Sequence, residues 1–166
     1  MGRAITIHDD LHCTGTISSK TITLPSSTVD DDSVEAAAGI QATKLQQQYS
    51  KFYAQESDTT SATEDYCIHC VHGSTGTVVA FEAGSVTACV GDSTITVDLH
   101  KDGASILTAA ITLDSSNAAY TPEAGTIDSA SIADSDVLEV VVVATVGTGT
   151  LGKGVYASCI IREDPS

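Results

Sequence analysis

The sequence contains no tryptophan and only two phenylalanines, Phe52 and Phe81. Surfaces that bind sugars or single-stranded nucleic acid are usually built from aromatic side chains on which rings stack. The chain therefore has little material for a carbohydrate-binding surface. Basic residues are also scarce, with seven Lys and Arg against 22 Asp and Glu, for a formal net charge of −15. Because a phosphate backbone is bound by a basic face, this composition argues against nucleic acid as a partner.

Long hydrophobic runs are missing as well. The longest apolar run, from Val140 to Val146, is broken by Thr145 and falls far short of the roughly 20 residues that a membrane-spanning helix needs. The first ten residues lack the apolar core of a signal peptide. We therefore expect no membrane partner and synthesis in a cytoplasm.

The cysteines are few and irregularly spaced. An odd set of five without the regular spacing of a disulfide framework is typical of reduced thiols. The five are Cys13, Cys67, Cys70, Cys89 and Cys159, and we expect several of them to be buried.

The composition of the sequence favours β-strands. Hydrophobic residues make up 42% of the 166 residues and charged residues only 17%, and Thr, Ser, Val, Ala and Gly suit packed strands and tight turns. From residue 65 onward, eight short candidate strands are separated by Gly, Asp, Ser and Pro. They predict a mainly β fold, an antiparallel β-sandwich of the jelly-roll-like kind. The candidate strands are 65–72, 77–82, 85–90, 93–100, 104–113, 126–132, 136–146 and 154–162.

Two of these segments carry the strongest patterns. Ile95, Val97 and Leu99 alternate with polar residues and are followed by Lys101-Asp102-Gly103, which predicts a hairpin into 104–113. The segment from Val137 to Val143 is apolar at nearly every position, so we expect a central strand that is covered on both faces.

The N-terminal third is different in character. Its apolar alternations last only a few residues before a polar turn, and strands this short cannot bury a face alone. Asp32 followed by Glu35 resembles a capping box, which predicts a short helix through the alanines to Gly39. A second short helix is expected over 42–48.

We therefore divide the chain into an N-terminal anchoring and oligomerisation arm (1–53), a polar linker (54–64) and the sandwich domain (65–166). The arm has four basic and six acidic residues, whereas residues 54–166 have three basic and 16 acidic ones, for a net charge of −13. The acidic part is expected to face solvent, or its acidity only maintains solubility. The apolar positions expected to carry oligomerisation and docking are Ile5, Ile7, Leu11, Ile22, Leu24, Val34, Ile40 and Leu45.

Four stretches of the chain carry a resemblance to a known family. Lys20–Pro25 and Val34–Gln46 resemble the N-terminal segments of tailed-phage capsid decoration (cement), head-fibre and fibre-like proteins. Gly84–Asp102 and Gly147–Asp164 are similar to the β-sandwich portion of such proteins. The resemblance implies a homotrimer on the virion surface, with an N-terminal anchoring arm and an exposed sandwich knob. The major capsid protein or another virion protein is the implied partner, and no catalytic residue is carried over.

The densest group of potential metal ligands is Cys67-Ile68-His69-Cys70-Val71-His72. Zinc would accept these ligand types. In a regular strand, however, Cys67 and His69 point to one face while Cys70 and His72 point to the other. Four ligands so arranged cannot converge on one tetrahedral ion, so we expect no metal site, with histidines gathered on a trimer axis as the alternative.

A second motif, Gly147-Thr148-Gly149-Thr150-Leu151-Gly152-Lys153-Gly154, nearly matches the phosphate-binding P-loop. It lacks the Ser or Thr after Lys153, and a β pattern rather than a helix follows. A glycine-rich loop between two strands is the better interpretation, so no cofactor is expected.

The remaining carboxylates give no sign of catalysis. Asp30, Asp31 and Asp32 lack the glycine and glutamate positions of a calcium-binding EF-hand loop. Other acids are scattered over turns without a pair suited to acid–base work, and no Gly-x-Ser-x-Gly motif presents a serine nucleophile. We therefore expect a non-enzymatic protein. Two functions compete, namely capsid decoration through the arm and host-receptor recognition by the sandwich loops.

Overall fold

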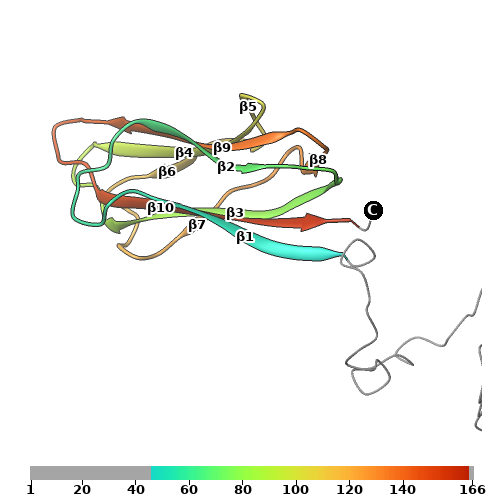
Figure 1. Cartoon of the computed structure of the whole chain (residues 1–166). Coiled ribbons are helices and arrows are strands. Elements are labelled where there is room, and N and C mark those ends of the chain that lie inside the picture. Colours follow the sequence, from blue (N-terminus) through green and yellow to red (C-terminus); the bar gives the residue numbers. More distant parts are fainter. Residues whose placement is uncertain (1–45, 165–166) are drawn as a thin grey trace, which may run out of the picture. The chain divides into compact units, whose positions relative to one another are not determined.

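The computed structural model describes residues 46–164, which form ten strands in two antiparallel sheets (Figure 1). The first sheet contains β1 (Gln47–Ala54), β10 (Lys153–Glu163), β3 (Gly76–Thr87) and β7 (Glu123–Ala124) in that order, and β8 (Ser131–Ile132) also pairs with β3. The second contains β2 (Glu64–Cys70), β9 (Val137–Thr145), β4 (Thr94–Lys101) and β5 (Ala104–Ser105), and β6 (Ile111–Leu113) also pairs with β4. The expected mainly β fold is thus confirmed. We call residues 46–164 the two-sheet domain.

One apolar core lies between the sheets. In β4, Ile95, Val97 and Leu99 are fully buried, as their alternation with polar residues predicts. In β10, Cys159 and Ile161 face the same core. Each buried aliphatic side chain of this kind contributes about 1.5–3 kcal/mol when it is removed from water, so the alternating strands contribute strongly to the stability of the domain.

The predicted hairpin after β4 is confirmed. Lys101 pairs with Ala104 and His100 with Ser105, which leaves Asp102 and Gly103 as the two turn residues. Their φ values of 50° and 79° fit the type I′ turn, which matches the twist of the flanking strands. The Asp102 carboxylate also accepts a hydrogen bond from the Val137 amide at 2.9 Å, which attaches the turn to β9.

Four predicted strands have different boundaries. The segments 77–82 and 85–90 were expected as separate strands, but β3 runs without a break from Gly76 to Thr87. The segment 104–113 divides into β5 and β6, because Ile106 and Leu107 both turn into the core. In 126–132, only Ser131 and Ile132 form a strand.

Strand β9 is central in its sheet, as predicted, between β2 and β4. The expectation that both of its faces are covered is wrong. Leu138, Val140 and Val142 are fully buried, but Val143 on the other face is 44% exposed. The apolar composition of this strand therefore exceeds what the core requires.

Strand β1 lies where we expected the end of the arm. It pairs with β10 along its whole length, from Gln47 opposite Glu163 to Ala54 opposite Tyr156. The helix expected over 42–48 therefore does not extend to Gln47 and Gln48. The polar stretch expected as a linker is the connection from β1 to β2, and it is held by the hydrogen bond from the Ser61 amide to the Gly152 carbonyl at 3.0 Å. In the part of the chain that the structure describes, no helix is long and apolar enough to cross a membrane.

Candidate functional site

The eight apolar positions assigned to the docking arm lie outside the described residues, and so do Cys13 and the three consecutive aspartates. The structure therefore does not test the docking role of Ile5, Ile7, Leu11, Ile22, Leu24, Val34, Ile40 and Leu45.

The cysteine and histidine cluster lies on β2 and the turn that follows it. A β-bulge interrupts the register, because Cys67 pairs with Glu139, His69 pairs with Leu138 and Ile68 is the extra residue. Cys70 pairs with Val137, two residues from Glu139 along β9. Since residues two apart share a face, both cysteines lie on the outer face, and the expectation that they face opposite sides is wrong.

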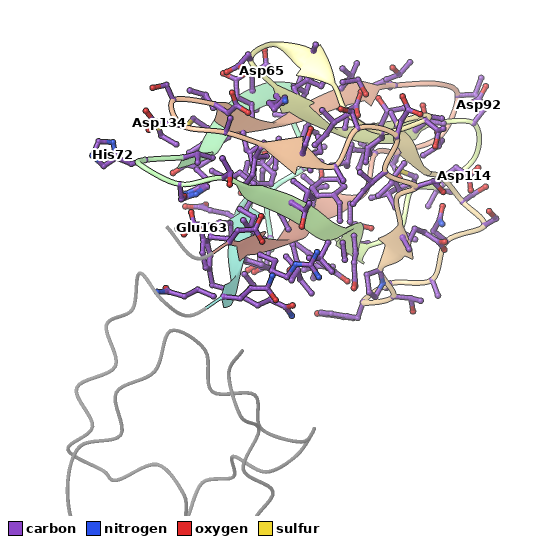
Figure 2. The ribbon with its side chains drawn as sticks, turned by 90° about the vertical axis from the view of Figure 1, so that its right-hand side faces the viewer. Asp65, His72, Asp92, Asp114, Asp134 and Glu163 are labelled. Carbon is purple, nitrogen blue, oxygen red and sulfur yellow. The ribbon has the colours of Figure 1, made fainter. Side chains whose placement is uncertain are left out.

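The bulge turns the two histidines in different directions. His69 lies opposite the buried Leu138, whereas His72 is exposed at one end of the domain (Figure 2). The four potential ligands do not converge. Among residues 46–164, no group of three or more His, Cys, Asp and Glu side chains is arranged to hold a metal ion.

His69 instead joins a hydrogen-bonded cluster between the two sheets. The Tyr49 hydroxyl donates to Glu163 Oε1 at 2.6 Å and lies 2.9 Å from His69 Nε2. Because the hydroxyl proton is used on Glu163, the bond to His69 requires the hydrogen on Nε2. The Tyr49 and His69 rings meet edge to face, with centroids 5.6 Å apart. The ammonium of Lys51 lies 5.1 Å from the centre of the Tyr49 ring.

The electrostatics of this cluster favour neutral rings. Burial, followed by the hydrogen bond and the charge of Glu163, raises the pKa of Tyr49 above its usual range. Burial, together with the charge of Lys51, lowers the pKa of His69, although Glu163 acts in the opposite direction. A neutral imidazole and a protonated phenol are thus the forms that connect β1, β2 and β10 near neutral pH.

A second tyrosine cluster lies further along β1. The Tyr53 hydroxyl donates to Glu64 Oε2 at 3.1 Å and accepts from Gln55 Nε2 at 2.8 Å. Burial is the main cause that raises the pKa of Tyr53 to about 12. Its ring also contacts Tyr66 of β2, with centroids 5.6 Å apart. Sequence reasoning missed both clusters, although Tyr49, Lys51 and Tyr53 repeat with the period of two that marks a strand face.

The glycine-rich segment 147–154 connects β9 to β10. The expectation of a loop between two strands is confirmed for residues 147–152, and the last two residues of the segment belong to β10. The Asp92 carboxylate accepts hydrogen bonds from the Thr148 amide and from the Thr148 hydroxyl, the latter at 2.8 Å. These bonds hold the pKa of Asp92 below its usual range. Backbone amides of this kind could bind an anion, but here the anion is a side chain of the same protein.

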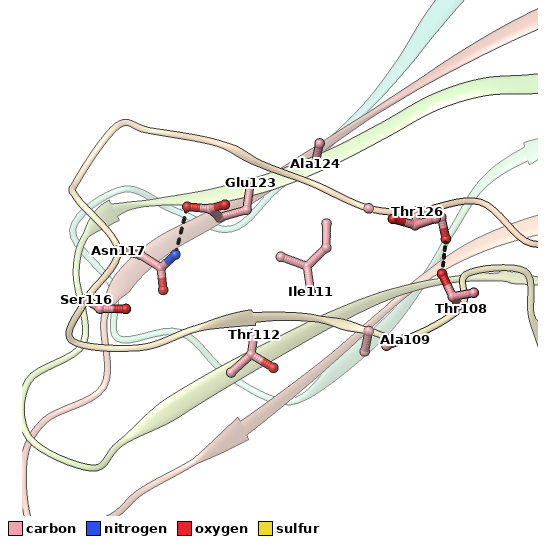
Figure 3. Close-up of a pocket in the computed structure, with 11 residues that line it drawn as sticks. Thr108, Ala109, Ile111, Thr112, Ser116, Asn117, Glu123, Ala124 and Thr126 are labelled. Carbon is pink, nitrogen blue, oxygen red and sulfur yellow. Dashed lines mark hydrogen bonds between the residues drawn. The ribbon is translucent and has the colours of Figure 1, made fainter.

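A polar groove of about 430 Å³ lies between residues 108–112 and 123–126 (Figure 3). The Thr108 hydroxyl donates to the Thr126 carbonyl at 2.9 Å, and Asn117 Nδ2 donates to Glu123 Oε1 at 3.0 Å. Glu123 is the single carboxylate among its lining residues. The groove therefore does not bring two carboxylates together, which is one arrangement by which separated pKa values assign an acid and a base.

A second hollow, of about 450 Å³, lies at the end of the domain where β10 begins. Its apolar lining includes Val90, Val146 and Leu151. Val90 is 58% and Val146 67% exposed. Two backbone hydrogen bonds between Val90 and Thr150, of 2.9 and 3.1 Å, fix the loops that form it. This hollow could accept a small apolar group.

Comparison with protein-family models finds no match, and a search of curated proteins finds no relative.

Proposed function

We propose that the protein is a non-enzymatic structural component of a phage virion that decorates and stabilises the capsid surface. In this proposal the N-terminal arm anchors it to the major capsid protein or another virion protein. The virion-surface location and the homotrimer come from the resemblance of the sequence to decoration and head-fibre proteins. We further propose that the two-sheet domain is a jelly-roll-like sandwich, because both sheets contribute to one core.

The observation that carries the proposal is the connection between the arm and the domain. Strand β1 contains the last residues of the arm, up to residue 53, and pairs with β10 over eight residues. At its start, Gln46 Nε2 donates to Asp164 Oδ1 at 3.1 Å. A pull on the arm would therefore act on a complete ladder of backbone hydrogen bonds, which suits a segment that bears a load.

The acidic residues of the domain support the same role. Several of them accept backbone hydrogen bonds in the turns, such as Asp134 from the Gly73 amide at 2.6 Å and Asp136 from the Ala133 amide at 2.9 Å. The carboxylates thus fix the turns and still carry the negative charge that keeps neighbouring knobs apart and hydrated. Attachment is then left to the less acidic arm.

The decisive experiment compares particles with and without the protein. Thermal or osmotic release of the packaged genome should require harsher conditions when the protein is bound, while host adsorption stays the same. Many weakly bound copies would act together, because each anchored protomer raises the effective concentration of the next. Unchanged particle stability would refute the stabilising role.

A receptor-binding function is the second candidate, and the apolar hollow near Val90 and Val146 favours it. These residues lie at the end of the domain opposite to the start of β1, because β1 and β10 are antiparallel and the hollow adjoins the start of β10. A Val146→Asp variant separates the two functions. Under capsid decoration the variant protects particles as well as the parent chain does, whereas under receptor recognition it lowers host adsorption.

A further inference from the structure

The outer face of the first sheet is unlike the rest of this acidic domain. We define it as the side chains of β1, β10 and β3 that alternate with the buried ones. Phe52 stands there with 66% of its surface exposed. Its ring stacks on Tyr156, with centroids 6.5 Å apart and planes inclined by 19°. The chain has only two phenylalanines, and one of them is exposed on this face. An exposed patch of aromatic surface is typical of an interaction site.

The apolar area continues across the neighbouring strands. Phe52 pairs with Ser158, so its diagonal neighbours on β10 are Tyr156 and Ile160. Ile160 in turn pairs with Ala80 of β3. Beside Ala80, a register shift leaves Val79 unpaired and 44% exposed. The result is a contiguous band from Tyr156 to Val79 across three strands.

The charge of this face is balanced. It carries one acid, Glu82, and one base, Arg162, whereas residues 54–166 as a whole have 16 acids and three bases. Glu82 pairs with Ser158, and Arg162 follows four residues later on β10, which places them about 13 Å apart along the strand. Within residues 46–164 neither side chain forms an ion pair. Arg162 Nε is buried there without a hydrogen-bond partner.

We propose that this face docks onto the same face of a second copy of the chain. In an isologous pair, Arg162 of each copy meets Glu82 of the other, so both charges that lack a partner are satisfied at once. A surface with no net charge also lets two strongly acidic chains approach where the rest of their surfaces repel. The two-fold axis then crosses the face midway between Arg162 and Glu82, between Ile160 and Ala80.

This contact is separate from the arm. It goes beyond the proposed decoration role, since it would join two assemblies through their knobs whatever the arm binds. Failure of the arm proposal would show in particle binding, whereas failure of this inference would show in the face-specific experiments below.

Charge reversal in the full chain tests the pairing. Arg162→Glu alone and Glu82→Arg alone place like charges together across the axis, so each should weaken association at least tenfold in sedimentation equilibrium. The double variant E82R/R162E restores opposite charges and should restore association. Equal association of all four proteins, or a double variant no better than the singles, would refute the inference. Thermal unfolding of each variant establishes that the domain is folded.

Crosslinking tests the position of the axis. An Ala80→Cys variant places thiols close to the axis, where the faces of two packed sheets lie about 10 Å apart. Because this separation exceeds the roughly 7 Å between Cα atoms that a disulfide spans, a short bifunctional thiol crosslinker is used. It should give a covalent dimer joined at position 80, as identified by peptide mapping. The control is Thr112→Cys on the outer face of the second sheet, where Thr112 pairs with Thr96, and it should give no such link. Crosslinking at both positions alike, or at neither, would overturn the proposed geometry.

Discussion

Tyr156 lies directly opposite Gly84 on the neighbouring strand, and its ring covers the glycine. A Cβ atom added at Gly84 would lie 2.5 Å from the Tyr156 hydroxyl oxygen and 2.7 Å from Cζ. The aromatic ring thus protects a stretch of strand that has no side chain of its own, an arrangement known to stabilise glycines in sheets. It also explains why β3 does not end at this glycine.

Gly84→Ala should therefore destabilise the domain by about 1–3 kcal/mol, because the added methyl group displaces a packed ring. The ring would also lose its stacking on Phe52. Chemical denaturation measures the change. In a Tyr156→Ser background the same alanine should cost much less, and equal costs in both backgrounds would show that the ring is not the cause.

The His69 cluster predicts a loss of stability in mild acid. Burial lowers the pKa of His69 below its ordinary value of 6.5, so the unfolded chain binds a proton more readily than the folded one. The stabilisation is complete when the pH is above the pKa of His69 in the unfolded chain. It decreases as the pH falls below that pKa towards the lower pKa of His69 in the folded chain. Melting temperatures measured from pH 7.5 to 5 should fall, and they should fall less in His69→Gln. His72→Gln is the matched control, because His72 is exposed. If the melting temperatures of both variants fell by the same amount between pH 7.5 and 5, the result would contradict the assignment to His69.

The thiols should differ sharply in reactivity. Cys67 and Cys70 are exposed on the outer face of β2, whereas Cys89 and Cys159 are buried. Burial also raises the pKa of the Cys159 thiol to about 12, which suppresses the reactive thiolate. Alkylation of the native protein followed by peptide mapping should label Cys67 and Cys70 within minutes. Cys89 and Cys159 should react only on unfolding, and their early labelling would be inconsistent with the core described above.

Truncation should separate the docking residues of the arm, Ile5 to Leu45, from the two-sheet domain. A chain that begins at Gln46 keeps β1 and should unfold cooperatively, but it should no longer bind particles. A chain that begins at Gln55 lacks β1, which exposes the edge of β10 and removes the buried ring of Tyr53. We expect this shorter chain to be unfolded or aggregated. Circular dichroism and thermal melts distinguish the two, and stable folding of the shorter chain would show that β1 is dispensable.

The sequence was informative wherever one local rule acted alone. Ile95, Val97 and Leu99 alternate without interruption, and Asp102-Gly103 supplies a turn with two positive φ values, so the strand and its hairpin could be predicted. The candidate arm residues offer no such comparison, because they lie outside the described part of the chain.

The errors arose where tertiary contacts override a local rule. Gly84 is a typical strand breaker, but a ring from another strand covers it. In β1 the inward-facing positions are Tyr49, Lys51 and Tyr53, whose polar ends concealed the strand. The hydroxyls of Tyr49 and Tyr53 are satisfied by Glu163 and Glu64, which lie outside the strand, and Lys51 contacts the Tyr49 ring. The faces of Cys67 and Cys70 could not be derived by counting, since alternation gives no warning of a bulge.

The bulge at Ile68 has a consequence for how β2 can change in length. Because Ile68 is the extra residue, Cys67, His69 and Cys70 already pair with three successive residues of β9. Loss of Ile68 would therefore leave a regular strand in the same register, with both thiols still outside and the imidazole still facing Tyr49. Only the contact of Ile68 with the core would disappear. At this one position a single-residue deletion is a milder change than many substitutions, so natural variants of β2 one residue shorter should keep the same pattern of inward and outward side chains.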